Sequence, residues 1–168
     1  MTNTDEDGDC RLKPDLELRR WQSEALLNLQ RIRHASERRL DELLREMDLQ
    51  VTPAQANVLM ILIAEKRPMT ARQLAADMEV SEVTVGRFLK ALERGDWISR
   101  DRDPDDARAI LVRPTTAARA ALPRFVRVSN AMLDVAFAGF DRDAVAQIVS
   151  MTRQVRVNLG RARREADG

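Results

Sequence analysis

A mainly α-helical protein with one small β-hairpin is predicted by the patterns that follow one another between Thr70 and Pro114. A short amphipathic segment, a turn and a longer amphipathic segment come first, and capping residues precede both segments. Two short apolar runs of β-forming residues then flank a charged loop. Helix, turn, helix and hairpin in this order make a winged helix-turn-helix, which longer helical patterns precede and follow.

The composition is that of a folded protein. Of the 168 residues, 44% are hydrophobic and 33% are charged, which is too apolar for a disordered chain. No apolar run approaches the ~18 residues that cross a bilayer, and the acidic N-terminus is unlike a secretory signal. We therefore expect a cytoplasmic location.

Enzymatic and metal sites are disfavoured by the scarcity of suitable side chains. Cys10 is the single cysteine and His34 the single histidine, which excludes an internal disulfide and a cysteine- or histidine-rich metal cluster. The chain also lacks a glycine-rich phosphate loop. We expect no catalytic residues, no cofactor and no bound metal.

Charge is unevenly distributed along the chain. The formal net charge is +1, but residues 1–15 carry −3, so the remainder carries +4. The basic residues outside the tail are nearly all arginines, which suit phosphate and guanine contacts. This distribution favours a polyanionic partner modestly.

Five parts are predicted along the chain. Residues 1–14 form an acidic disordered tail, 15–50 a long N-terminal helix, and 51–114 the winged helix-turn-helix. Residues 115–161 form C-terminal helices, and 162–168 a frayed end. The first helix is longer than a small domain needs at ~1.5 Å per residue, so we expect part of it to pack on a second copy.

Local signals place the helix ends. Thr52 and Thr70 each begin a capping box, Ser81 caps the third helix of the domain, and Gly95 ends it. A helix beginning at Thr115 or Thr116 is expected to be kinked or broken near Pro123. After a cap at Asp141, the last helix carries a heptad seam that we expect to pair with a partner chain: Val145, Ile148, Thr152, Val155 and Leu159.

The helix after Ser81 has the pattern of a DNA-recognition helix. Its buried stripe is Val85, Phe88, Leu89 and Leu92, and the opposite face is free for a major groove. On that face Arg87 can bind guanine or phosphate, Val83 and Thr84 can meet thymine methyl groups, and Gly86 permits close approach. The candidate DNA-binding residues of this helix are Ser81, Glu82, Val83, Thr84, Gly86, Arg87 and Lys90.

The predicted hairpin supplies a second candidate contact. Its loop carries Arg102 and Arg108, which are placed to enter the neighbouring minor groove. The acidic residues of the loop would repel phosphate if all were exposed. Asp106, beside Arg108, is therefore expected to orient an arginine.

The segment from Val80 to Thr115 closely resembles the recognition helix and wing of the MarR family of bacterial transcription regulators. The resemblance rests on Leu92-Glu93-Arg94-Gly95, on Ile98-Ser99-Arg100, and on Asp103-Pro104-Asp105-Asp106-Ala107-Arg108 followed by Thr115. The flanking helices extend it over roughly residues 16–161. Two positions depart from the family pattern, because Glu79 and Ala118 stand where glycine is common.

The resemblance implies a homodimer that binds a pseudo-palindromic operator in double-stranded DNA, with Arg108 in the minor groove. It also implies a small aromatic or anionic effector, and the face of the first helix that carries His34 lines the effector pocket in such proteins. A repressor released by its ligand is the expected function. The alternative is a winged-helix module for protein interaction that does not bind DNA.

Overall fold

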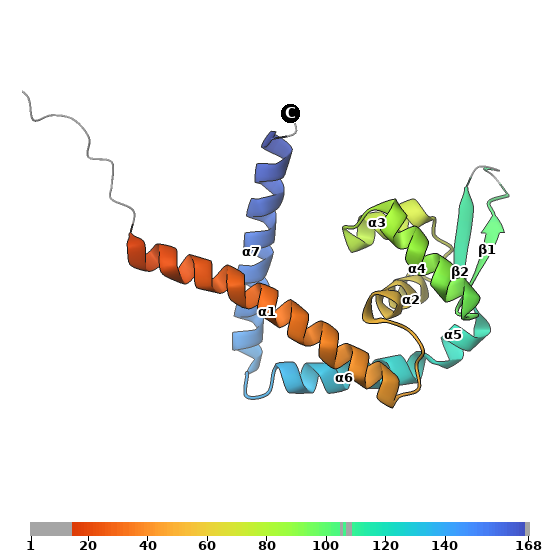
Figure 1. The fold of residues 1–168 in the computed structure, drawn as a ribbon, viewed down its shortest axis with the longest axis horizontal. Helices are drawn as coiled ribbons and strands as arrows, with labels where there is room; N and C mark the ends of the chain where they lie inside the picture. The colour runs from red at the N-terminus through yellow and green to blue at the C-terminus, as the bar shows by residue number, and fades with distance from the viewer. Residues whose placement is uncertain (1–14, 105, 107–108, 167–168) are drawn as a thin grey trace, which may run out of the picture. The chain divides into compact units, whose positions relative to one another are not determined.

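The computed structural model describes residues 15–104, 106 and 109–166 and is mainly helical, with one antiparallel hairpin (Figure 1). This agrees with the predicted fold class. The elements are α1 (Leu16–Glu46), α2 (Pro53–Glu65), α3 (Ala71–Met78), α4 (Glu82–Arg94), β1 (Ile98–Arg102), β2 (Ile110–Pro114), α5 (Thr116–Ala120), α6 (Leu122–Ala136) and α7 (Arg142–Ala166).

The chain divides into two compact units within α1, the first ending at Arg39 and the second beginning at Leu40. In the first unit, α1 leaves much of its apolar stripe uncovered, and Trp21 and Ile32 are each 60% exposed. The end of α1 belongs to the second unit, where Leu43 and Leu44 are buried.

One hydrophobic core holds the second unit together. It joins the end of α1 to α2, α3, α4, the hairpin, α5 and the start of α6. Its largest fully buried side chains are Leu44, Leu49, Leu59, Leu62, Met69, Leu74, Leu89, Leu92, Val58, Val85 and Val112. Burial of such side chains contributes roughly 1.5–3 kcal/mol each relative to exposure, so this core fixes α4 and the hairpin on a common base.

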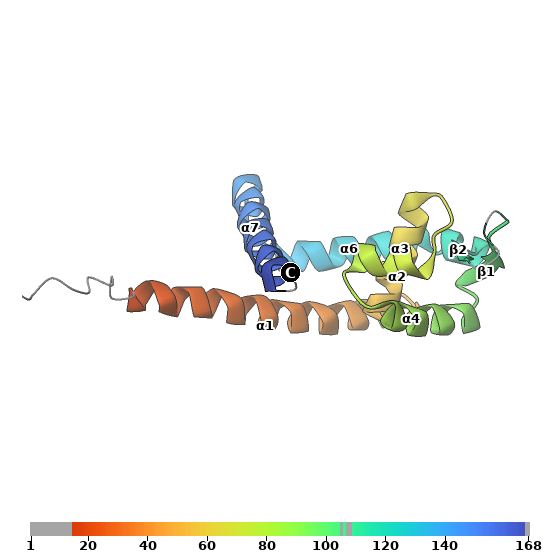
Figure 2. The same cartoon turned by 90° about the horizontal axis from the view of Figure 1, so that it is seen from above.

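The hairpin pairs Ile98 with Pro114 at its base and Arg102 with Ile110 at its outer end. It is joined by a bridge from Met69, whose amide donates to the Val112 carbonyl at 3.2 Å and whose carbonyl accepts from the Val112 amide at 2.8 Å. The segment before α3 is thereby tied to the wing, an attachment that the sequence pattern does not predict. Figure 2 views the same elements from above.

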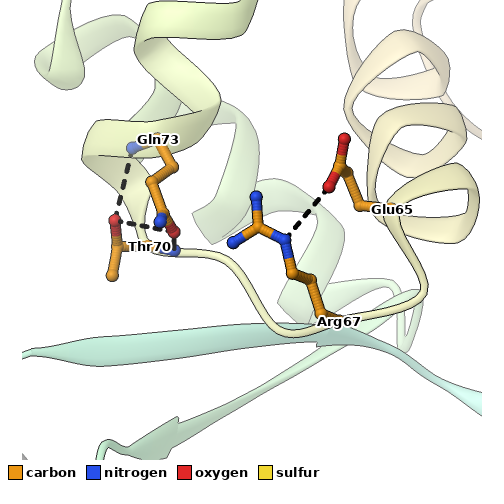
Figure 3. A network of polar contacts seen from close by, with 4 residues as sticks. All are labelled: Glu65, Arg67, Thr70 and Gln73. Atoms are coloured by element: carbon orange, nitrogen blue, oxygen red, sulfur yellow. Dashed lines mark hydrogen bonds and ion pairs between the residues drawn. The ribbon is translucent and has the colours of Figure 1, made fainter.

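Both capping boxes are confirmed. At α3 the Gln73 amide donates to Thr70 Oγ1 at 3.2 Å, and the Thr70 amide donates to Gln73 Oε1 at 2.9 Å. Figure 3 shows this pair beside the Arg67–Glu65 ion pair, which joins the end of α2 to the loop that follows it. Thr52 and Gln55 form the same box at α2. Each cap satisfies amides that the first helical turn leaves without partners.

Gly95 is the C-cap of α4, as predicted, but it does not adopt the left-handed conformation. Its φ is −88°, and the positive φ of 57° occurs at Asp96 instead. The need for glycine is steric, because a Cβ at Gly95 would lie 2.9 Å from Cδ1 of Trp97. Trp97 in turn packs edge-on against Phe125, with ring centroids 5.8 Å apart, and so connects the wing to α6.

The helix predicted near Pro123 is broken, with α5 and α6 separated at Ala121. The start of α5 is fixed by Thr115, whose Oγ1 accepts from the Ala118 amide at 3.1 Å and donates to the Asp96 carbonyl at 2.8 Å. Ala118 is fully buried. Further along, Arg124 on α6 donates to the carbonyls of Met47 and Asp48, which anchors the end of α1.

Asp141 caps α7 as predicted, since its carboxylate accepts from the Ala144 amide at 2.8 Å. None of the α7 side chains that the structure describes is buried. Of the heptad seam, Val145 and Ile148 are half-buried, whereas Val155 and Leu159 are exposed.

Along the described part of the chain, no helix is both long and apolar enough to cross a membrane.

Glu79 ends α3 in the left-handed conformation, with φ 54° and ψ 39°. A Cβ makes this conformation unfavourable, and glycine relieves it. Glu79→Gly is therefore expected to be more stable to urea unfolding than Glu79→Ala, by about 1 kcal/mol. Both changes remove the side chain that pairs with Arg156, so their difference reports mainly on the backbone. Equal stabilities of the two variants would show that Glu79 is not strained.

Candidate nucleic-acid interface

One face of α4 is anchored in the core. Val85, Leu89 and Leu92 are buried and Phe88 is half-buried, at the spacing of a single helical stripe. This face packs against α2 and α3, and the C-terminal end of the helix packs against β1. The orientation of α4 about its own axis is therefore fixed by the core.

The opposite face of α4 is exposed and mostly basic. Val83, Arg87, Lys90 and Arg94 follow one another at intervals of four, three and four residues, which places them in one line along the helix. Val83 is 69% exposed, and the three cations are exposed. Within the described residues, no ion pair engages these cations. We call these four residues the basic stripe of α4.

The N-terminal end of α4 is capped by Ser81. Its Oγ accepts from the Thr84 amide at 3.2 Å and lies 2.8 Å from Thr84 Oγ1, so the hydroxyl of Thr84 is already engaged. Glu82 is exposed, whereas Thr84 and Gly86 are half-buried. A Cβ at Gly86 would meet nothing within 4 Å, so the protein's own packing does not require glycine there.

In the wing, Arg102 is the last residue of β1 and is exposed. On the same face of the hairpin, Nε of Arg100 lies 3.2 Å from a carboxylate oxygen of Glu93 on α4. Arg113 on β2 lies 3.8 Å from Asp101. The predicted minor-groove residue, Arg108, lies outside the described residues, as does its expected pairing with Asp106.

Arg94 is a candidate contact that the sequence interpretation missed. It lies seven residues after Arg87 and eleven after Val83, so its position in the basic stripe follows from helical periodicity alone. In the sequence, this arginine belongs to the pattern Leu92-Glu93-Arg94-Gly95, which indicates the end of the helix. An arginine at this place extends the positive surface of α4 toward the wing.

A groove of about 860 Å³ lies between the turn that joins α3 to α4 and the C-terminal half of α7. Arg72, Glu79, Glu82 and Arg156 border it, and its apolar lining includes Ala75, Val80 and Val157. Arg156 spans the groove, with Nη1 2.7 Å from Oε1 of Glu79. His34, the predicted ligand residue, is exposed in the first compact unit.

No metal-binding cluster is formed by the part of the chain that the structure describes, since no three His, Cys, Asp or Glu side chains there could hold an ion together.

Comparison with protein families matches residues 51–110 to the MarR family. A relative in Bacillus subtilis (strain 168), the uncharacterized HTH-type transcriptional regulator YcgE, is 28% identical over 75 residues. That match covers 44% of this chain and 49% of the relative, so the chain spans about half of the relative's length.

Solved structures share the fold over most of the chain. SlyA, a transcriptional regulator, superposes with a TM-score of 0.74 at 21% identity over 82% of this chain and 95% of its own. MepR of S. aureus, solved with DNA, gives 0.73 at 21% identity over 79% and 96%. A cysteine-to-serine mutant of E. coli MarR, complexed with operator DNA, gives 0.65 at 25% identity over 78% and 95%. The chain therefore contains a winged helix-turn-helix that matches the MarR family over residues 51–110.

Proposed function

We propose that this protein is a transcription regulator that binds double-stranded DNA through α4 and the wing. The observation that carries the proposal is the basic stripe of α4, which is exposed opposite a buried face. A major groove admits one helix, and Arg87, Lys90 and Arg94 can then contact phosphates or guanine. The relatives solved with DNA support this assignment. Arg102 and Arg108 of the wing are assigned to the adjacent minor groove.

The functional unit that we propose is a homodimer on a pseudo-palindromic operator. Large apolar side chains are exposed along α1, at the end of α6, in the loop that follows it and along α7, which is costly for a protein that remains monomeric. The principal ones are Leu16, Trp21, Leu26, Ile32, Leu133, Val135, Phe140, Val149, Met151 and Leu159. A second copy that covers them would hold two α4 helices at a fixed spacing, as two half-sites require.

A repressor released by a small ligand is the mode of regulation that we propose. The groove beside the α3–α4 turn is large enough for a small aromatic anion, and Arg72 and Arg156 at its edge can bind the negative charge. Binding there would compete with Glu79 for Arg156. The turn that precedes α4 would then be repositioned.

Selection of bound duplexes from random DNA tests the proposal. We expect two symmetric half-sites about one helical turn apart, and an affinity that falls steeply as salt rises because bound phosphates release counterions. Absence of binding at any salt concentration would contradict the proposal. That result would favour the alternative, a module for protein interaction.

A further inference from the structure

Glu82 places a carboxylate at the N-terminal end of a recognition surface that is otherwise basic and apolar. It is the first residue of α4 and is exposed, and it also borders the groove between the α3–α4 turn and α7. Within the residues described, no hydrogen bond or ion pair engages its side chain. Nor is it the cap of the helix, since Ser81 fills that role together with Thr84.

The neighbours of Glu82 leave it as the main polar group of the first turn. The hydroxyl of Thr84 lies 2.8 Å from Oγ of Ser81 and is held at the cap. Val83, which is 69% exposed, offers only methyl groups. The next free polar side chain on this surface is Arg87, one turn further along. The first turn therefore presents one acceptor beside an apolar contact, and the second turn presents a donor.

An ionised carboxylate can only accept hydrogen bonds, which limits its partners on DNA. Phosphates repel it, and guanine and thymine present acceptor atoms in the major groove. Adenine offers its N6 amino group, but the N7 acceptor lies beside it. Cytosine offers its N4 amino group without a neighbouring acceptor on the same base, and is the base that Glu and Asp side chains bind.

We propose that Glu82 recognises a cytosine in each half-site and so helps to determine the operator sequence. The inference rests on the proposed DNA binding and goes beyond it, because it assigns one residue to one base. The competing role for Glu82 is structural, since an acidic residue in the first turn stabilises a helix by its interaction with the helix dipole. That role predicts an effect on stability alone.

The experiment compares the full-length wild type with Glu82→Gln and Asp77→Asn by selection from random duplexes, followed by affinity measurements on single-base variants. Asp77→Asn is the matched control, because Asp77 is exposed on α3 and its change removes the same charge. For the wild type we expect cytosine at one symmetric pair of positions. Glu82→Gln should lower the preference for cytosine over adenine there by about tenfold or more, since glutamine binds adenine through N6 and N7.

The control should keep the wild-type preference at every position. A Glu82→Gln protein that binds all sequences more tightly, without a changed preference, would place Glu82 near the backbone and overturn the inference. An unchanged profile with a lowered melting temperature would overturn it in favour of the helix-dipole role. If the wild type itself selects no sequence, the proposed function fails. If the wild type selects sites that lack this cytosine, only the inference about Glu82 fails.

Discussion

Replacing Arg87 with alanine is expected to weaken binding to the selected operator by about 1–3 kcal/mol, which corresponds to roughly 5- to 150-fold. Arg87 lies in the middle of the basic stripe, is exposed, and belongs to a helix whose opposite face is buried. Its guanidinium can donate two hydrogen bonds to a guanine or a phosphate, and truncation to a methyl group removes both. Fluorescence anisotropy with labelled operator DNA, at two salt concentrations, measures the loss.

The control for this experiment is Arg127→Ala. Arg127 is exposed on α6, so its change removes the same charge from a surface that we do not assign to DNA. A similar loss in both variants would show that overall charge, rather than contact by Arg87, governs binding. The salt dependence separates two roles of Arg87. Loss of a phosphate contact reduces the salt slope by about 1, whereas loss of a guanine contact relaxes sequence preference at one position.

Much of the fold follows from local patterns in the sequence. Capping residues such as Thr52, Thr70 and Ser81 predict where helices begin because they satisfy amides of the adjacent turn. The buried stripe of α4 follows from its period of 3.6 residues. Two short runs of β-forming residues stand out in an otherwise helical sequence, and the loop between them predicts that they pair as a hairpin. These signals depend on residues within one or two helical turns, so they can be recognised in the sequence without the tertiary structure.

Features that depend on distant residues escape such patterns. Met69 pairs with Val112, which lies 43 residues later in the sequence. Because only one residue pairs on this side, no alternating pattern in the sequence predicts the bridge. Gly95 is required because Trp97 folds back against it, a contact that only the three-dimensional arrangement reveals. At the groove, Glu79 pairs with Arg156, which lies 77 residues later in the chain. Pairing of this kind is set by the packing of whole helices.

The candidate DNA-binding residues were predictable to the extent that α4 is regular. Arg87 and Lys90 follow from the face opposite the buried stripe, and Arg94 could have been found with the same rule. Which base each residue contacts depends on how the helix enters the groove, and the sequence carries no periodic signal for that. Glu82 is informative for this reason, since its chemistry narrows the choice of base without a model of the complex.

Replacing Leu89 with alanine is expected to destabilise the protein by about 2–5 kcal/mol. Leu89 is 2% exposed and lies on the anchored face of α4, so its truncation leaves a cavity where α4 meets the core. Val83→Ala is the matched control, since it shortens an aliphatic side chain on the same helix at a position that is 69% exposed. Urea unfolding at a fixed protein concentration measures both, because the stability of a dimer depends on concentration.

The two variants should separate the two faces of α4. Val83→Ala should change the free energy of unfolding by less than about 0.5 kcal/mol. It should nevertheless weaken binding to an operator with thymine opposite Val83, because the methyl contact is lost. Leu89→Ala should keep its sequence preference as long as it remains folded, since Leu89 does not face the groove. If instead Val83→Ala were strongly destabilising, its side chain would be buried against a partner, and the exposed face of α4 would serve protein association.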